Sequence, residues 1–596
     1  MSETWPDGSI IVRSLEPLGP HPRSVIHDFR QHSEQHPDRP LLIELDGNRR
    51  VELSWGEARR QADSLAQSLL DRGLASRSLL VLSRNSRLHL LALLAGMTVG
   101  APVVPTSVAY SLRSVSHTRL REVAQLVDPA LVVAEDSSYN AAVSAVASGR
   151  LVLSREGDVP GSLSLVEMTR KAPSVDVELR CAALEYADTA KIMFSSGSTG
   201  APKGVITTHG MLSANQQQMR QIWPFLHEDP PVVLDWLPWS HTFGGSHNLN
   251  MILSNGGTLW VDDGGPGPAL IERTVRNLNL ARPTIYFNVP AGYSSLLPQL
   301  ERDPAAARAF FDRLRVVFYA AAALPQQSWD RIVKLAEEYG SEVRITTSWG
   351  LTETSPAATS AHFPILRSDC IGVPLPGLEL RLVPMTEKSE VRVRGVTVTP
   401  GYYSDSTSTA QAFDEDGFFR TGDAVAMVNQ DDPHQGLVFR GRIAEDFKLA
   451  TGTFVHVGAL RPRLVSASSN LISDAVICGH DGDRVTAMAW LSPGHANRCD
   501  SDGVPEEGLR RELTATLRRL AAEGRGSSQR VERVLVLLEP PQLDSGELTD
   551  KGYINQRVVR ERRADLVALL AADPLAPQVV ALDLSGESMI EPEADH

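Results

Sequence analysis

Residues 191–204 read KIMFSSGSTGAPKG, and this stretch says more about the chain than any other. Its first four residues, apolar apart from Lys191, predict a strand. The loop that follows holds two glycines, three serines and one threonine before Lys203. Glycine has no Cβ and tolerates positive φ, so backbone N–H groups can turn inward beside the hydroxyls and the ammonium. The pattern favours a polyphosphate cradle over a flexible Ser/Gly loop, and it lacks the Gly-Lys-Ser/Thr ending of a Walker A loop.

Length and composition limit the class of protein. A chain of 596 residues suggests two to four folding units. With 42% hydrophobic and 22% charged residues it is typical of a globular protein, and its net charge of −14 argues against a nucleic-acid partner. Its four scattered cysteines have no metal-binding spacing, and its most apolar segment, residues 90–104, is shorter than the roughly 20 residues of a membrane span. The N-terminus lacks the apolar core of a signal peptide. We therefore expect a cytoplasmic protein without a membrane partner.

The pattern of apolar runs predicts two domains. Up to about residue 440, short β-rich runs alternate with helical patterns, which indicates α/β units with mostly parallel sheets; these runs include residues 79–82, 131–134, 232–234 and 316–319. Residues 378–398 alternate like strands of a smaller antiparallel sheet or barrel. The remainder predicts an α+β domain with strands near 474–477 and 534–538 and helices over 506–523 and 553–570. We place the domains at 1–441 and 442–596.

The order Ser-Ser-Gly-Ser-Thr-Gly-x-Pro-Lys-Gly resembles the phosphate loop of the adenylate-forming superfamily. That superfamily includes acyl- and aryl-CoA ligases, luciferases and the adenylation domains of peptide synthetases. It has a large N-terminal domain and a small mobile C-terminal one. The resemblance implies that the ATP phosphates are bound by Ser195, Ser196, Gly197, Ser198, Thr199, Gly200 and Lys203.

Two further motifs follow in the superfamily's order. The sequence WGLTE at residues 349–353 resembles its aromatic-Gly-x-Thr-Glu motif, which contributes Trp349 and Gly350 to the nucleotide site. The resemblance implies that Thr352 contacts the α-phosphate and that Glu353 holds Mg²⁺, a hard cation that prefers carboxylate oxygen. Upstream, Ala321 and Ala322 occupy a small-residue turn against which the adenine would lie. The structural alternative for the WGLTE motif is a loop with a capping threonine. For the alanine turn it is simple packing at a helix start.

The C-terminal motifs carry the remaining nucleotide contacts. The resemblance implies that Asp423 bridges the two ribose hydroxyls, that Arg442 contacts ribose or phosphate, and that Lys448 belongs to the same hinge region. Ala444 stands where the superfamily usually has the Asp or Lys pivot, so the pivot stays open. Lys551 is the candidate for the lysine that enters the site for adenylation. A surface turn for Asp423 and a solvated lysine for Lys551 are the alternatives.

Residues 236–248 combine two tryptophans, two histidines and a glycine pair. A zinc site needs a third ligand, and the sequence offers none. The resemblance places His241 at the border of the acid-binding tunnel, with a role in catalysis, whereas His247 is equally well explained as a core histidine. The aromatic side chains suit a flat substrate.

Several stretches look like the feruloyl-CoA synthetase branch, which joins hydroxycinnamic acids to coenzyme A; they are residues 232–248, 286–290, 443–452 and 547–557. The resemblance implies an AMP-forming ligase that uses ATP, Mg²⁺ and coenzyme A to activate an aromatic acid. Ser240 and Ser246 depart from the branch, which leaves the acid open.

Rival functions remain. Activation of nitrous acid and its transfer to an aryl amine would use the same ATP machinery. A nucleotide-binding regulator without chemistry is a third interpretation, against which the retained Lys203, Glu353, Asp423 and Lys551 argue. A serine hydrolase is disfavoured because no Gly-x-Ser-x-Gly elbow is present. The oligomeric state stays open, with a homodimer as one option.

Overall fold

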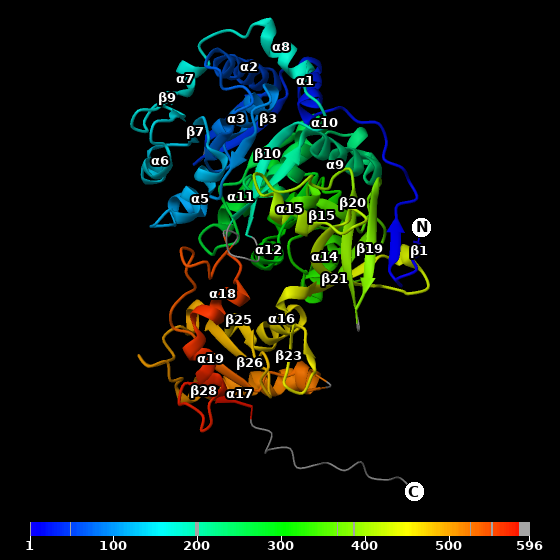
Figure 1. Ribbon diagram of the computed structural model, residues 1–596, viewed down its shortest axis with the longest axis vertical. Helices are drawn as coiled ribbons and strands as arrows, with labels where there is room; N and C mark the ends of the chain where they lie inside the picture. The colour runs from blue at the N-terminus through cyan, green and yellow to red at the C-terminus, as the bar shows by residue number, and fades with distance from the viewer. Residues whose placement is uncertain are drawn as a thin grey trace. The chain divides into compact units, whose positions relative to one another are not determined.

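The computed structural model describes residues 2–47, 49–196, 202–365, 367–385, 388–524, 526–549 and 552–582. The chain forms two compact units. The first comprises Met1–Thr421 and Val425–Phe439, and the second comprises Gly422–Ala424 and Arg440–His596. Helices pack on sheets in each unit (Figure 1). This confirms the predicted α/β fold with a large N-terminal part and a small α+β C-terminal part.

A seven-stranded sheet forms one half of the first unit, in the order β11-β10-β6-β5-β7-β8-β9. Its strands are β5 (Leu79–Leu82), β6 (Val103–Pro105), β7 (Leu131–Ala134), β8 (Leu151–Ser154), β9 (Leu163–Ser164), β10 (Thr189–Ser196) and β11 (Pro202–Thr208). All neighbours are parallel except β11, which runs antiparallel to β10. The runs LLVL and LVVA of β5 and β7 are buried throughout, as expected of parallel strands covered on both faces.

The second sheet has fifteen strands, in the order β1-β2-β19-β20-β21-β22-β18-β17-β16-β15-β14-β12-β13-β3-β4. Its parallel strands are β3 (Pro40–Asp46), β12 (Val232–Asp235), β13 (Thr258–Val261), β14 (Ile285–Asn288), β15 (Val316–Tyr319) and β16 (Arg344–Gly350). The other strands are β1 (Ser2–Thr4), β2 (Ile10–Arg13), β4 (Arg49–Ser54), β17 (Ala357–Ser360), β18 (Cys370–Pro374), β19 (Leu378–Pro384), β20 (Ser389–Gly395), β21 (Phe419–Met427) and β22 (Leu437–Arg442). The antiparallel pair expected within 378–398 is present as β19 and β20.

The main hydrophobic core of the first unit lies between the two sheets. It joins residues of β5 and β7 to residues of β14 and β15 through the helices α1 (Val25–Gln35), α2 (Trp55–Asp71), α3 (Arg87–Thr98), α9 (His209–Ile222) and α10 (Leu249–Asn255). Helix α3 is buried from Leu88 to Thr98, because its sequence RLHLLALLAGMT is apolar on all sides. It is followed by β6.

The first unit contains further helices. They are α4 (Val108–Leu112), α5 (Thr118–Val127), α6 (Asn140–Val146), α7 (Leu165–Met168), α8 (Val175–Ala182), α11 (Ile271–Ala281), α12 (Pro290–Arg302), α13 (Pro304–Phe311), α14 (Gln326–Glu338) and α15 (Ser406–Ala412).

The second unit is built on a four-stranded sheet, β25-β26-β27-β28. Its elements are the hairpin strands β23 (Phe447–Lys448) and β24 (Phe454–Val455), the sheet strands β25 (Ile472–Cys478), β26 (Thr486–Leu491), β27 (Arg533–Val536) and β28 (Val579–Ala581), and the helices α16 (Val457–Ala467), α17 (Glu507–Glu523), α18 (Gln556–Arg562) and α19 (Ala564–Ala571). Helix α17 agrees with the predicted helix over 506–523.

The prediction of a single helix over residues 553–570 is wrong, because two helices lie there. Helix α18 begins only after Asn555, whose side chain accepts a hydrogen bond from the Val558 N–H. The helical segment is then interrupted at Arg563 before α19 begins. The Arg563 guanidinium pairs with the Glu547 carboxylate at 2.8 Å, a contact between distant residues that the local pattern could not reveal.

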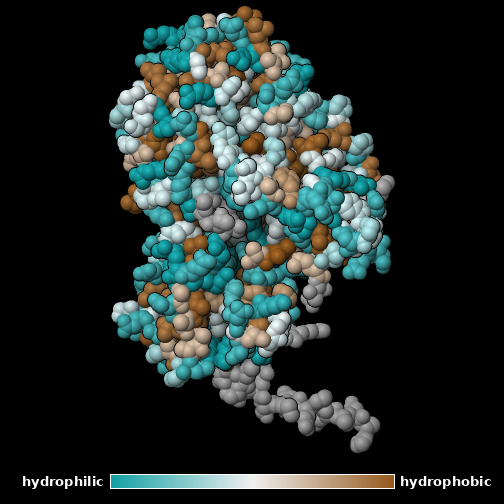
Figure 2. All heavy atoms as spheres, viewed as in Figure 1, coloured by the Kyte–Doolittle hydropathy of each residue, from teal (hydrophilic) through white to brown (hydrophobic). Residues whose placement is uncertain are grey.

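Hydrophobic side chains on the visible face appear as separate patches among hydrophilic ones (Figure 2). In the described part of the chain, no helix combines the length and apolar character needed to cross a membrane. All four cysteines are free, and three of them are buried.

Candidate nucleotide and acid site

The phosphate-loop motif lies on the hairpin formed by β10 and β11. Their antiparallel register pairs Ser195 with Lys203 and Ser196 with Pro202. The loop at the turn of this hairpin, with Gly197, Ser198, Thr199 and Gly200, lies outside the described residues. The hairpin therefore brings the first serines of the motif beside its lysine.

The two principal motifs meet at Glu353. This residue lies in the short 3-10 helix η4 (Thr352–Thr354), directly after β16, and is only 8% exposed. The Ser195 hydroxyl lies 3.5 Å from Glu353 Oε1, and the Tyr402 hydroxyl donates a hydrogen bond to the same oxygen at 3.1 Å. The Lys203 Nζ lies 5.0 Å from the centre of the Tyr402 ring. Residues that are far apart in the sequence thus bring two hydroxyls to one carboxylate oxygen, and a lysine lies over the ring of the tyrosine that carries one of them.

The structure shows a contact of Tyr402 that the sequence motifs did not predict, namely its hydrogen bond to Glu353. Burial raises the pKa of its hydroxyl, and the Glu353 carboxylate raises it further. The tyrosine therefore stays protonated at neutral pH and can keep donating its hydrogen bond. The sequence signal was its position in a Tyr-Tyr pair after Gly401, which marks a motif but no partner.

The turn assigned to adenine follows β15. Ala321 has a φ of +71°, in a region that most residues with a side chain avoid. Ala321 and Ala322 are exposed. The strands β14, β15 and β16 are parallel and in register, so this turn and the WGLTE motif start from the same edge of the sheet. Ligands of open α/β sheets bind at such carboxyl ends of strands.

Gly350 of the WGLTE motif occupies a position that only glycine fits. A Cβ on it would lie 1.8 Å from the backbone oxygen of Pro356. Trp349, the preceding residue, is 8% exposed and belongs to the main core. The motif is therefore anchored on one side by a buried indole and on the other by close backbone packing.

The segment with the two histidines forms a π-helix, η3 (Phe243–Asn248), that continues into α10. His241 precedes it and is half-buried, whereas His247 is buried. The His247 ring lies 5.3 Å from the ring of Phe287 and 5.4 Å from that of Phe318, measured between centroids. The structure thus puts His247 in an aromatic cluster with Phe243, Phe287 and Phe318.

A hydrogen-bonded chain orients His247. Its Nδ1 lies 3.0 Å from Asn248 Oδ1, and the Asn248 amide donates to Asp235 Oδ2 at 2.7 Å. Burial lowers the pKa of His247 to about 4 and raises the pKa of Asp235 to about 7. His247 is therefore neutral at physiological pH and donates from Nδ1, because Asn248 Oδ1 can only accept.

The second unit holds Asp423, Arg442 and Lys448. Asp423 lies on β21 and is 3% exposed, and its Oδ1 is 3.6 Å from the Nε of Arg442. Lys448 lies on β23 with its Nζ 4.7 Å from the centre of the Phe454 ring. The carboxylate that the resemblance assigns to ribose and the guanidinium that it assigns to ribose or phosphate are therefore neighbours within this unit. Lys551 lies outside the described residues.

Glu353 is the carboxylate that the sequence motif assigns to a metal ion. Within the described ranges, no group of three or more His, Cys, Asp or Glu side chains is arranged to hold a metal ion. One buried carboxylate suits a magnesium ion whose other ligands are phosphate oxygens and water, which is the usual arrangement for nucleotide-bound Mg²⁺. The residues present therefore fit Mg²⁺ that arrives with ATP.

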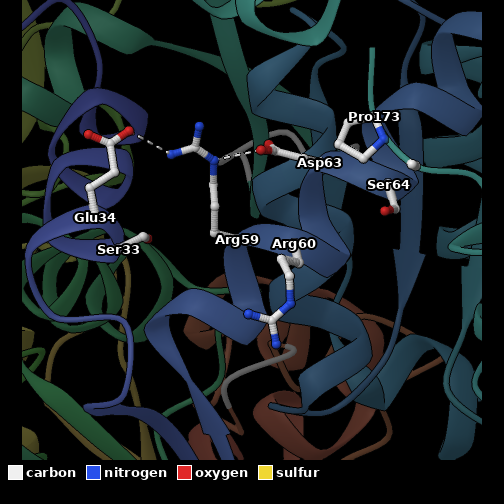
Figure 3. Close-up of a pocket in the computed structure, with 8 residues that line it drawn as sticks. Ser33, Glu34, Arg59, Arg60, Asp63, Ser64 and Pro173 are labelled. Carbon is white, nitrogen blue, oxygen red and sulfur yellow. Dashed lines mark hydrogen bonds and ion pairs between the residues drawn. The ribbon is translucent and has the colours of Figure 1, made fainter. Parts of the chain in front are cut away.

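A separate pocket of about 410 Å³ lies between α1 and α2 (Figure 3). Arg59 pairs with two carboxylates that line the pocket, because it contacts Asp63 at 2.5 Å and Glu34 at 3.5 Å. Because these ion pairs neutralise Arg59, we assign no chemical role to this pocket.

Comparisons with known proteins find a matching family and similar sequences. The AMP-binding enzyme family matches residues 29–403. The long-chain-fatty-acid–CoA ligase FadD15 of Mycobacterium tuberculosis is 25% identical over 591 residues, which cover 90% of this chain and 94% of the relative. The probable 4-coumarate–CoA ligase 2 of Dictyostelium discoideum is 29% identical over 295 residues, which cover 48% of this chain and 50% of the relative.

Among solved structures, that of the anthranilate CoA ligase AuaEII in complex with anthranoyl-AMP has a TM-score of 0.71 at 19% identity, and the match covers 93% of this chain and 98% of that one. At this identity the likeness supports the fold alone. The family match extends over more than half of the chain and contains the phosphate-loop motif, the WGLTE motif and Tyr402. The chain therefore belongs to the AMP-binding enzyme family.

Proposed function

We propose that the protein is an ATP-dependent acid–CoA ligase that forms an acyl-AMP from an aromatic carboxylic acid and transfers the acyl group to coenzyme A. The observation that carries the proposal is that the Ser195 and Tyr402 hydroxyls meet at Glu353 Oε1, with Lys203 over the Tyr402 ring. Two hydroxyls at one buried carboxylate, with a lysine next to one of them, suit a polyphosphate and its magnesium ion. The full-length relatedness to a CoA ligase supports the choice of acceptor.

The first step joins the acid to AMP. A carboxylate oxygen attacks the α-phosphorus of ATP, a new P–O bond forms, and the bond to the β-phosphate breaks so that pyrophosphate leaves. Ser195, Lys203 and Thr352 would bind and orient the phosphates, and their donors would stabilise the negative charge that grows on them. Magnesium, when bound at Glu353, would neutralise part of that charge.

The second step transfers the acyl group. The thiol of coenzyme A loses its proton and attacks the acyl carbon, and the bond between that carbon and the phosphate oxygen breaks so that AMP leaves. We propose that residues 442–596 act as the mobile domain of the superfamily, with Asp423, Arg442 and Lys448 near the nucleotide. Lys551 would bridge the carboxylate and the phosphates during the first step.

An aromatic acid of the feruloyl type is the substrate class we propose. The support is the cluster of Phe243, Phe287, Phe318 and His247 beside the edge where β14 and β15 end. Flat rings pack well in offset or edge-to-face contact with such side chains. His241, at the half-buried start of the same segment, would border the acid.

The test is a substrate screen with the purified protein, ATP and Mg²⁺. We expect AMP release with hydroxycinnamic acids, and sustained turnover to the thioester only when coenzyme A is present. A long-chain fatty acid is the matched comparison for the substrate. Among variants, Lys203→Ala should lower activity at least tenfold, whereas Lys171→Ala, at an exposed side chain, should not. No AMP release with any acid would contradict the proposal. AMP release that depends on nitrite and an aminocinnamic acid, and not on coenzyme A, would show that the acceptor is an aryl amine.

A further inference from the structure

Lys191 is a buried cation within an otherwise apolar strand. It lies on β10, four residues before Ser195, and its exposed fraction is 0%. Its Nζ donates a hydrogen bond of 2.6 Å to the backbone oxygen of Gly245. No carboxylate of a described residue forms an ion pair with it, and burial alone lowers its pKa to about 7. A buried ammonium is costly unless it is well bonded, so this contact requires an explanation.

The contact falls on the π-helix η3. In this helix the Leu249 N–H donates to Gly244 O, five residues earlier, which replaces the usual α-helical spacing. A π-helix is rare and often marks a functional site. Gln216 on α9 donates from Nε2 to Ser246 O at 3.3 Å and to His247 O at 3.4 Å. Three successive carbonyls of η3 are therefore bound by side chains from two neighbouring elements.

Backbone packing also restricts the same segment at its two glycines. A Cβ on Gly244 would lie 2.4 Å from Leu237 O, and one on Gly245 would lie 2.0 Å from Trp239 O. The π-helix is thus packed against the backbone of residues 237–239 and bound by the side chains of Lys191 and Gln216. Its position determines where Phe243 and His247 meet Phe287 and Phe318.

Alternate residues of a strand face the same side, so Lys191 and Ser195 point from one face of β10. Ser195 reaches Glu353, and Lys191 reaches Gly245. One strand therefore connects the proposed phosphate contact with the aromatic cluster.

We propose that Lys191 is a positioning residue that holds η3 in place and thereby sets the affinity for the acid. This inference rests on the proposed function, because it takes the aromatic cluster as one wall of the acid site. Lysine suits the task because its four-carbon stem reaches across the core and its amine offers N–H donors to a carbonyl.

The test compares the Michaelis constants for the acid and for ATP in acid-dependent AMP release. Lys191→Met keeps the stem and removes the donor. We expect it to raise the KM for the acid about tenfold, which corresponds to about 1.4 kcal/mol, and to leave the KM for ATP within about twofold. Lys191→Gln restores a neutral donor and should recover most of the loss. Lys171→Met, on a side chain 61% exposed, is the matched control and should behave as wild type.

The outcomes separate the two proposals. Wild-type protein without acid-dependent AMP release contradicts the proposed function. Active wild type with an unchanged acid KM in Lys191→Met, or with both constants raised equally, overturns the positioning role. If Lys191→Met does not fold, Gln216→Met serves as the second variant, since it removes the donors to Ser246 O and His247 O. An unchanged acid KM in that variant also overturns the inference.

Discussion

At the residue scale, Glu353 is the point where the phosphate-loop strand and the WGLTE motif meet. Ser195 and Tyr402 both reach its Oε1, and its 8% exposure limits competition from water. The WGLTE motif indicated Glu353 from the sequence, because its residue types and order are specific. The Tyr402 contact could not be predicted, because it depends on the loop between β20 and α15 returning to this position.

The role of Glu353 leads to a prediction about magnesium. Glu353→Gln keeps an oxygen that can accept the Tyr402 hydrogen bond but removes the negative charge. We expect the Mg²⁺ concentration needed for half-maximal AMP release to rise at least tenfold, because a neutral amide is a poor ligand for a hard cation. Magnesium titration at saturating ATP measures this.

Tyr402→Phe is the matched control for that experiment. It removes one hydrogen bond to Glu353 and leaves its charge, so the magnesium requirement should change by less than about fivefold, in line with a net value of about 1 kcal/mol. A Glu353→Gln protein with the same magnesium dependence as wild type would refute the metal-binding role.

At the element scale, the π-helix η3 is the least predictable part of the candidate site. Its sequence FGGSHN contains two glycines and no feature specific to a π-helix. Only the packing explains them, because the backbone oxygens of Leu237 and Trp239 occupy the space that side chains would need. The parallel strands, by contrast, were predicted correctly, since apolar runs of four residues between helical patterns leave few other structures.

Gly245→Ala tests whether this element must stay in place. The added methyl would meet Trp239 O at 2.0 Å, so η3 must shift. We expect a loss of about 1–3 kcal/mol in unfolding free energy, as for other overpacked sites, together with a higher KM for the acid. Thermal unfolding and AMP-release assays measure the two effects.

Gly494→Ala is the control, because no atom lies within 4 Å of a Cβ built there. It should unfold at the wild-type temperature. If Gly245→Ala matches wild type in both stability and acid KM, close packing does not determine the position of η3.

At the scale of the whole molecule, each unit has its own hydrophobic clusters. Those of the second unit run from Phe447 to Val580 and include Leu513 and Leu517 on α17, both fully buried. The clusters of the first unit contain no buried residue beyond Leu437. Chains with separate cores generally do not unfold in a single two-state transition.

We therefore expect calorimetry to resolve two unfolding transitions. Leu513→Ala should lower the temperature of one, because truncation of a buried leucine costs about 2–5 kcal/mol. Leu300→Ala, at a site 1% exposed in the first unit, should lower the other. If either variant shifts both transitions equally, the two cores do not unfold separately.

The sequence alone determined the superfamily, the α/β class, the α+β C-terminal part and the order of the nucleotide motifs. Short motifs and apolar periodicity carry that information locally, because a phosphate cradle and a buried parallel strand each need particular residues in a particular order. Tertiary structure decided which side chains meet. Tyr402 contacts Glu353, Lys191 contacts Gly245, and Arg563 contacts Glu547 at the point where a continuous helix was expected. Such contacts depend on how separate segments pack in space, and no local pattern encodes a partner that lies 16, 49 or 54 residues away.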